Sequence, residues 1–347
     1  MIERIIILGG KGGVGKSSIS AATAIALSDL LPDKKLLLIS FDIAHNLTDM
    51  FNTQIGEKLT KITNNLWGIE PDPDEYAEQY TKVFAKKMKA LIKKMPIVGM
   101  IPQIKTFVDT TFTADSIPLA LKNAMFFQKI LDAEDTIYRK DDDEIDFDIL
   151  IADFPPTGNM IALFDVPEDT VKVVLKYSLN FYNSIKNSLQ GVSKMFKKVM
   201  HPFEPEVNKE QISDELVKML TDLEERGERI SELINNVGSL RLVTIAEKPS
   251  FEEIKRARDL TNKYLNLEGV HVNMLIPEEN AATCDFCGQI HSLQKKYLKD
   301  IMLEFQQTKI WQSNKLKEEP IGLEGLRKLA KAIYGDASAQ DILYPKS

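Results

Sequence analysis

Cysteine is scarce in this chain, and the two cysteines that occur lie close together. Cys284 and Cys287 are the only cysteines among 347 residues. Two cysteines cannot form a disulfide framework, so the sequence excludes the class of small, disulfide-stapled secreted proteins. Their C-x-x-C spacing instead indicates metal or redox chemistry in a reducing compartment.

Long apolar runs and an excess of basic charge are also missing. No stretch approaches 18 consecutive apolar residues, and the short apolar run at the N-terminus passes directly into a glycine-rich loop, unlike a signal peptide. The 51 acidic and 44 basic residues give a net charge of −7, which is not typical of a general nucleic-acid binder. We therefore predict a cytoplasmic protein that is not an integral membrane protein and does not bind nucleic acid.

Short β-branched and leucine-rich runs alternate with helical stretches along much of the chain. The runs show no polar alternation, which is typical of strands buried on both faces of a parallel sheet. They span residues 5–8, 35–41, 147–153, 240–246 and 270–275, and a helix is expected over 17–31. This alternation predicts an α/β fold with a doubly wound, mostly parallel sheet.

Two long segments interrupt the alternation and are mostly helical in pattern. We predict a single domain over 1–347, with its core at about 1–75, 131–175 and 236–335, and a helical subdomain formed by about 76–130 and 176–235. Seven of the 12 methionines fall within 81–130 and 171–220, and methionine is over-used on surfaces that accept varied apolar partners. Apolar residues at helical spacing form the candidate binding groove: Met88, Leu91, Met95, Met195, Phe196, Val199 and Met200. A helical cap on the sheet or a membrane-surface helix would give the same pattern.

The loop after the first strand matches the phosphate-binding pattern G-x-x-x-x-G-K-[ST]. Its glycines allow the backbone N–H groups to turn toward phosphates, and the following helix points its positive end at the anion. Lys16 is expected to reach the β- and γ-phosphates of ATP, and Ser17 to ligate Mg²⁺. The predicted nucleotide-binding residues of this loop are Gly10, Lys11, Gly12, Gly13, Val14, Gly15, Lys16, Ser17 and Ser18.

Two aspartates end apolar strands: Asp42 is a candidate for catalysis together with Lys11 and Lys16, and Asp153 is a candidate magnesium ligand. Asp153 occupies a position typical of a Walker B carboxylate, which contacts Mg²⁺ directly or through water. Asp42 ends the second strand, where a carboxylate can orient or deprotonate the attacking water.

The loop contains a second lysine, Lys11, and therefore resembles the deviant Walker A loop. That loop, the D-x-A-H-N-L-x-D-x-F stretch from Asp42, the D-x-x-P-T-G stretch from Asp153 and the late C-x-x-C together resemble the arsenite-pump ATPase family. Within this family these motifs most resemble those of the guided-entry branch, which delivers tail-anchored membrane proteins. The resemblance extends to about residue 335.

The resemblance implies roles for several residues. It implies a homodimer in which Lys11 reaches the partner's nucleotide and Asp42 is the hydrolytic residue. It further implies nucleotide contacts from Glu247, Asn273, Pro320 and Ile321. The chain departs from the family pattern at four places: Ile43, Pro155, Asn159 and Lys248-Pro249.

The cysteine pair leaves several interpretations open. Structural zinc requires four ligands, and two pairs facing each other across a two-fold axis would supply them, which favours zinc shared by a homodimer. His291 as a third ligand within the chain, a shared iron–sulfur cluster and plain free thiols are the alternatives.

We therefore expect an ATPase that uses ATP, Mg²⁺ and Zn²⁺. The first hypothesis is a dimeric targeting chaperone that captures the transmembrane helix of tail-anchored proteins and passes it, with handover co-chaperones, to a membrane receptor. The alternatives are an arsenite-efflux pump subunit, an iron–sulfur cluster carrier, and a partition or division-site ATPase.

Overall fold

The structure, a computed structural model, describes residues 2–42, 46–72, 129–134, 139–140, 143–157, 225, 228–262 and 264–346. The chain divides into two compact units, one made of Met1–Asp72, Phe127–Phe164 and Ser231–Ser347, the other of Pro73–Phe126 and Asp165–Ile230. Nearly all described residues belong to the first unit. The predicted client groove, from Met88 to Met200, lies outside the described residues, so it stays a prediction.

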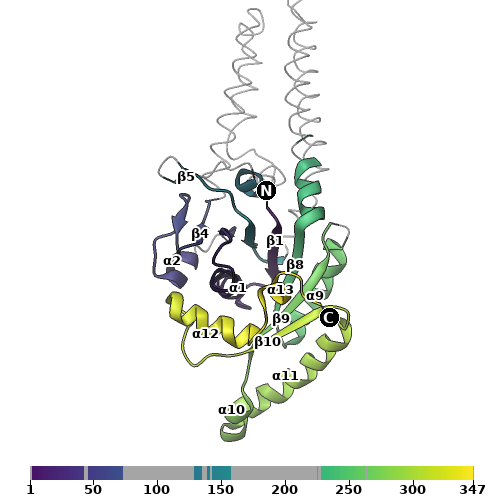
Figure 1. The fold of residues 1–347 in the computed structure, drawn as a ribbon. Helices are drawn as coiled ribbons and strands as arrows, with labels where there is room; N and C mark the ends of the chain where they lie inside the picture. The colour runs from purple at the N-terminus through teal and green to yellow at the C-terminus, as the bar shows by residue number, and fades with distance from the viewer. Residues whose placement is uncertain are drawn as a thin grey trace, which may run out of the picture. The chain divides into compact units, whose positions relative to one another are not determined.

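A mostly parallel sheet forms the centre of the first unit (Figure 1), which confirms the predicted α/β class. Its eight strands follow the order β10-β9-β8-β1-β7-β2-β4-β3, and only β3 pairs antiparallel with its neighbour. The strands are β1 (Arg4–Gly10), β2 (Leu36–Ser40), β3 (Thr60–Lys61), β4 (Leu66–Ile69), β7 (Ile149–Asp153), β8 (Gly238–Ile245), β9 (Leu267–Leu275) and β10 (Lys309–Asn314). A separate short pair is formed by β5 (Arg139–Lys140) and β6 (Asp143–Glu144).

The helices cover both faces of this sheet, as the β-branched runs predict. Ile6 and Leu8 of β1 belong to one apolar cluster with residues of α1 and α12, whereas Ile5 and Ile7 are equally buried but lie outside that cluster. Because side chains alternate along a strand, the second pair faces the opposite side, where α9 packs on β1 and β8. The described helices are α1 (Lys16–Leu30), α2 (Asn46–Phe51), α9 (Lys248–Thr261), α10 (Glu278–Thr283), α11 (Asp285–Glu304), α12 (Gly322–Tyr334) and α13 (Ala339–Leu343).

All five predicted strands form, with small shifts at their ends. Three further strands of this sheet, β3, β4 and β10, escaped the sequence analysis, as did the short pair β5 and β6. β4 is only four residues long and contains Gly68, and β10 alternates polar and apolar residues at an edge of the sheet. Short or mixed segments of this kind carry a weak periodic signal, so pairing with β2 and β9 determines them.

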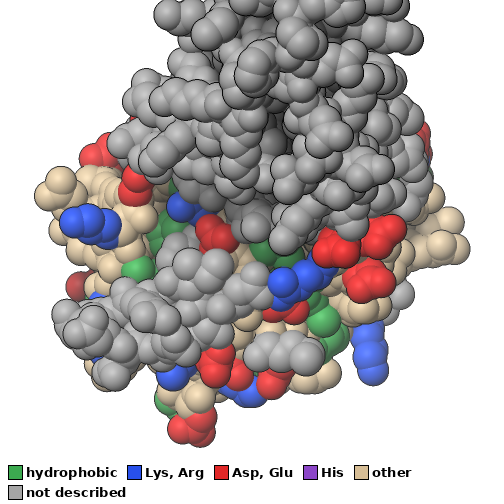
Figure 2. Space-filling view, turned by 90° about the horizontal axis from the view of Figure 1, so that it is seen from above, with side chains coloured by type: hydrophobic (Ala, Val, Ile, Leu, Met, Phe, Trp, Pro, Cys, Tyr) green, Lys and Arg blue, Asp and Glu red, His purple; other side chains and the backbone are tan. Residues whose placement is uncertain are grey.

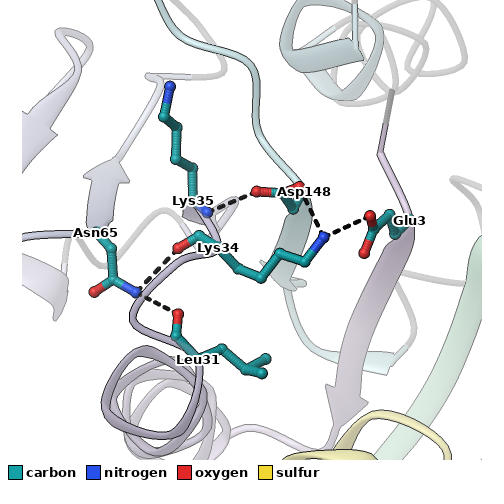
Figure 3. A network of polar contacts seen from close by, with 6 residues as sticks. All are labelled: Glu3, Leu31, Lys34, Lys35, Asn65 and Asp148. Carbon is teal, nitrogen blue, oxygen red and sulfur yellow. Dashed lines mark hydrogen bonds and ion pairs between the residues drawn. The ribbon is translucent and has the colours of Figure 1, made fainter.

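A polar network fixes the turn between α1 and β2 (Figure 3). It lies where the parallel strands β1, β2 and β7 begin, whereas the glycine loop follows the other end of β1. Lys34 Nζ donates to Glu3 at 2.6 Å and to Asp148 at 3.2 Å, which ties the turn to the segments that precede β1 and β7. Asn65 Nδ2 donates to the carbonyl oxygens of Leu31 and Lys34. These contacts set where β2 begins and hence where its carboxyl end at Ser40 lies.

Candidate functional site

The glycine loop lies between β1 and α1, as predicted. Gly13 and Gly15 have φ values of 81° and 86°, a left-handed region that other residues rarely adopt. A Cβ on Gly15 would also lie 2.5 Å from Asn273 Nδ2. The loop therefore requires glycine at position 15 for both its backbone conformation and its packing.

Lys16 and Ser17 form the first turn of α1 and are both buried. The Lys16 side chain is 4% exposed, and its ammonium nitrogen lies 3.9 Å from Asp42 Oδ2. No acidic side chain occupies the first turn of α1, and Gly15 provides no side-chain cap. The amide groups at this helix start are thus left for an anion, which is the arrangement that phosphate binding requires.

Asp153 lies at the end of β7, the strand next to β1, with no exposed surface. Ser20 Oγ donates to its Oδ1 at 3.1 Å, and Ser40 Oγ donates to its Oδ2 at 3.2 Å. Burial raises the pKa of Asp153 to about 6, while a hydrogen bond from Ser17 and the charge of Lys16 act in the opposite direction. A buried carboxylate beside the Ser17 hydroxyl provides the hard oxygen ligands that Mg²⁺ prefers.

The sequence analysis missed two of the three serines that hydrogen-bond to Asp153, namely Ser20 and Ser40. Ser20 follows Ser17 by three residues on α1, and Ser40 ends β2, the strand on the other side of β7. Helical spacing from the loop could have identified Ser20. Ser40 could not be found in this way, because its contact depends on the strand order β1-β7-β2.

Asp42 follows β2, and its carboxylate faces Lys16. Its amide N–H donates to Ser40 Oγ at 3.4 Å, so Ser40 contacts both candidate aspartates. Residues 43–45 lie outside the described part of the chain, and α2 begins directly after them. The structure therefore places the Asp42 carboxylate beside Lys16, and the role of Asp42 in hydrolysis stays a proposal.

Glu70 anchors α2, and no motif in the sequence analysis pointed to it. Its side chain is almost completely buried after β4, and its Oε1 accepts a hydrogen bond from the Leu47 amide at 2.8 Å. The Leu47 N–H belongs to the first turn of α2, which leaves it without a partner inside the helix. The position of α2 is therefore tied to the end of β4.

Asn273 contacts the glycine loop itself. Its Nδ2 donates to the Val14 carbonyl at 3.0 Å, and its Oδ1 accepts from Ser313 Oγ at 2.8 Å. The predicted contact of Asn273 with the adenine stays a prediction. In the structure its amide joins β9, β10 and the loop.

The remaining predicted nucleotide residues follow the carboxyl ends of the strands β1, β8 and β10. Lys11 is partly exposed, Glu247 is exposed at the start of α9, and Ile321 is 43% exposed just before α12. Pro320 is half-buried beside it. The departure at Lys248-Pro249 is accommodated because Pro249 lies in the first turn of α9, where no intrahelical N–H is required.

The two cysteines lie at the exposed start of α11. Cys284 is the N-cap residue, and its Sγ accepts a hydrogen bond from the Cys287 amide at 3.3 Å, which contributes to lowering the pKa of Cys284. Across the described residues, no group of three or more histidine, cysteine, aspartate or glutamate side chains could hold a metal ion. His291 Nδ1 instead lies 2.8 Å from the Ile276 carbonyl, which argues against this nitrogen as a third ligand.

Charged side chains of both signs are mixed over the described part of the face in Figure 2. That part of the face has no continuous basic surface. Within the described ranges, no helix has both the length and the apolar character that crossing a membrane requires.

A strand–glycine loop–helix unit, with a buried carboxylate at the end of the adjacent strand, defines a P-loop nucleoside triphosphatase. The chain belongs to the anion-transporting ATPase family, whose model matches residues 3–335. It is therefore an ATPase, and the family predicted from the motifs is confirmed.

Relatives with two kinds of name are found in this family. The chain is 31% identical to a protein named arsenical pump-driving ATPase 1 from Aquifex aeolicus, over 98% of this chain and 81% of that protein. It is 31% identical to a protein of Chlorobaculum tepidum named arsenical pump-driving ATPase, over 98% of this chain and 78% of the relative. It is 26% identical to the ATPase GET3 of Candida albicans, over 94% of this chain and 88% of that protein.

Proposed function

We propose that this ATPase acts as a cytoplasmic homodimer that captures the transmembrane helix of tail-anchored proteins and delivers it to a membrane receptor. The observation that carries the dimer is the cysteine pair at the start of α11, exposed at Cys284 and half-buried at Cys287, which supplies half of a tetrahedral ligand set. The second lysine of the glycine loop and the relatives named GET3 support the same function. Handover co-chaperones are expected partners.

ATP would be held at the loop between β1 and α1. Lys16 would contact the β- and γ-phosphates, and Ser17 with Asp153 would hold Mg²⁺, which offsets phosphate charge when bound. The serine contacts of Asp153 keep its carboxylate turned toward Ser17. Asp42 would orient or deprotonate the attacking water, and Lys11 of the partner would stabilise charge that develops on the phosphates.

Zinc shared between two subunits would join the homodimer through Cys284 and Cys287. Native mass spectrometry of the purified chain, with and without ATP, reports stoichiometry and bound metal together. The expected species is a dimer with one zinc ion, and Cys284→Ser with Cys287→Ser should lose the metal. Monomers only, or an iron–sulfur cluster with its visible absorbance, would contradict this assignment.

Client capture is tested with a purified tail-anchored peptide. With ATP, the wild-type chain should keep the apolar helix in solution, and Met195→Asp with Val199→Asp should abolish capture because both substitutions charge the predicted groove. Lys197→Asp with Lys198→Asp is the matched control, since these positions are polar in the same segment. Unimpaired capture by the first variant would show that the groove is wrongly assigned.

A second candidate function is an arsenite-efflux pump ATPase, and the relatives named arsenical pump-driving ATPases favour it. Two thiols at neighbouring positions suit a soft, thiol-binding ion such as arsenite. Strong stimulation of ATP hydrolysis by arsenite, lost in Cys284→Ser, would support this candidate over the first. No response to arsenite, together with client capture, would remove it.

A further inference from the structure

The end of β9 contains a residue in an unfavourable backbone conformation. Met274 has a φ of 59°, in the left-handed region that residues with a side chain rarely adopt. Such a residue persists only where the surrounding contacts hold it. We call residues 273–276 the β9 turn, and its contacts reach three different elements.

On one side the β9 turn packs directly against the glycine loop. Asn273 Nδ2 donates to the Val14 carbonyl at 3.0 Å. A Cβ on Gly15 would lie 3.3 Å from Met274 Cε. Two successive side chains of the turn therefore press on the loop that binds phosphate, and a change in the backbone at Met274 would move both.

On the other side the turn is held by Gln294 of α11. Gln294 Nε2 donates to the Met274 carbonyl at 3.1 Å, and its Oε1 accepts from the Ile276 amide at 2.8 Å. One side-chain amide thus forms hydrogen bonds with two backbone groups of the turn, one on each side of Leu275. His291 lies one turn earlier on the helix, and because its Nδ1 faces the Ile276 carbonyl at 2.8 Å, this nitrogen must be the donor.

Burial makes the Gln294 contacts strong constraints. The Gln294 side chain is 6% exposed, although only Gln294 and Ile301 are buried along the 20 residues of α11. If the Gln294 side-chain amide were removed, the Ile276 N–H and the Met274 carbonyl would lose this hydrogen-bond partner, which costs free energy at a buried site. β10 supports the turn from a third direction, because the Lys315 amide donates to the Leu275 carbonyl at 2.8 Å.

We propose that Gln294 is a positioning residue for nucleotide binding: it holds Met274 in the left-handed conformation and thereby sets Asn273 and Met274 against the glycine loop. The Gln294 side chain hydrogen-bonds to the β9 turn, and the turn contacts the loop, so the effect of Gln294 passes through the β9 turn. The inference rests on the nucleotide site proposed above and is independent of the client. α11 would then be a structural support of the ATP site as well as the carrier of the cysteine pair.

The test compares Gln294→Met with the matched control Gln289→Met. Methionine has nearly the same length and volume but forms neither hydrogen bond, and Gln289 is exposed on the same helix. Isothermal titration with Mg·ADP should show a dissociation constant raised roughly tenfold for Gln294→Met and unchanged for Gln289→Met. An unchanged constant for Gln294→Met, even with a lowered melting temperature, would overturn the proposal. A wild-type chain that does not bind Mg·ADP would overturn the nucleotide site as well.

A double-mutant cycle with Asn273→Ala tests the route. If Gln294 acts through Asn273, the two substitutions together should weaken Mg·ADP binding by less than the product of their separate effects. Strictly multiplicative effects would contradict this route. Hydrogen exchange on the wild-type chain gives an independent reading that needs no variant. Mg·ADP should slow exchange of the Ile276 amide, because coupling between two sites is reciprocal, and unchanged exchange would overturn the proposal.

Discussion

At the scale of single residues, the glycine loop carries two lysines with different surroundings. Lys16 is buried beside Asp42, whereas Lys11 is only partly buried and lies near the opposite end of the loop. We expect Lys11→Ala to keep its affinity for Mg·ADP, because Lys16 and the backbone amides remain. Its turnover number should fall roughly 10³-fold, as when a charge supplied by a partner is removed. Steady-state hydrolysis and nucleotide titration measure the two effects separately, and a variant that hydrolyses ATP normally would refute the role of Lys11.

Glu70 should affect turnover without affecting affinity. Its carboxylate anchors α2 through the Leu47 amide, and α2 follows the segment that begins at Asp42. Glu70→Leu keeps a similar volume but removes the acceptor, so Asp42 should be less well positioned and turnover should fall by roughly ten- to a hundredfold. The Mg·ADP dissociation constant should stay within about twofold, because the glycine loop is held by other contacts. Glu252→Leu, at an exposed position of α9, is the control.

Residue roles differ in how far the sequence predicts them. The glycine loop and Asp153 follow local motifs, so spacing alone predicted their positions on the fold, between β1 and α1 and at the end of β7. Glu70 and Gln294 belong to no motif, because each acts by contacting a backbone group that is distant in sequence. Such residues become identifiable only when the order of the strands is known.

At the scale of elements, the C-terminal helix α13 is bound by two arginines from the sheet. Arg241 Nη2 donates to the carbonyls of Ile342 and Leu343, and Arg4 Nε donates to Leu343 at 3.1 Å. Arg241 is completely buried, and burial lowers its pKa. Hydrogen bonds to these carbonyls therefore replace the water that the two guanidinium groups lose on burial. Arg4 also forms an ion pair with Glu268.

A truncation after Ala337 should destabilise the fold strongly. It would leave the buried Arg241 without the carbonyls of Ile342 and Leu343, and a buried charge that loses its partner costs about 3 to 5 kcal/mol. Truncation after Tyr344 keeps both carbonyls and is the matched control. Urea denaturation should show the loss of unfolding free energy only for the shorter chain, and equal stabilities would mean that the arginines gain little from α13.

The sequence predicted the most deeply buried strands and missed the short or partly exposed ones. Strands buried on both faces, such as β1 and β7, have uniform apolar runs that predict them from sequence. The edge strand β10 and the short β4 have no such run and form because a neighbour offers its hydrogen bonds. The C-x-x-C motif indicated the chemistry of the two cysteines. It did not predict that Cys284 is the N-cap residue of α11.

At the scale of the whole molecule, the proposed mechanism makes each active site depend on two subunits. Asp42 lies beside Lys16 of its own chain, so it belongs to the site of its own subunit. Lys11 would belong to the site of the partner. A heterodimer of a Lys11→Ala subunit with an Asp42→Ala subunit then contains one complete site, on the Lys11→Ala subunit, and one site that lacks both residues.

Mixing these two inactive variants should therefore restore hydrolysis. Random exchange of subunits at equal concentrations makes half of the dimers mixed, each with one of two sites intact, so the expected activity is about a quarter of the wild-type value. If Lys11 acted within its own subunit, every site in the mixture would lack one residue and no activity would return. Steady-state ATP hydrolysis of the mixture, with each variant alone as the control, separates these outcomes. Recovery that rises with total protein concentration would tie it to subunit association, since unassociated chains contain no complete site.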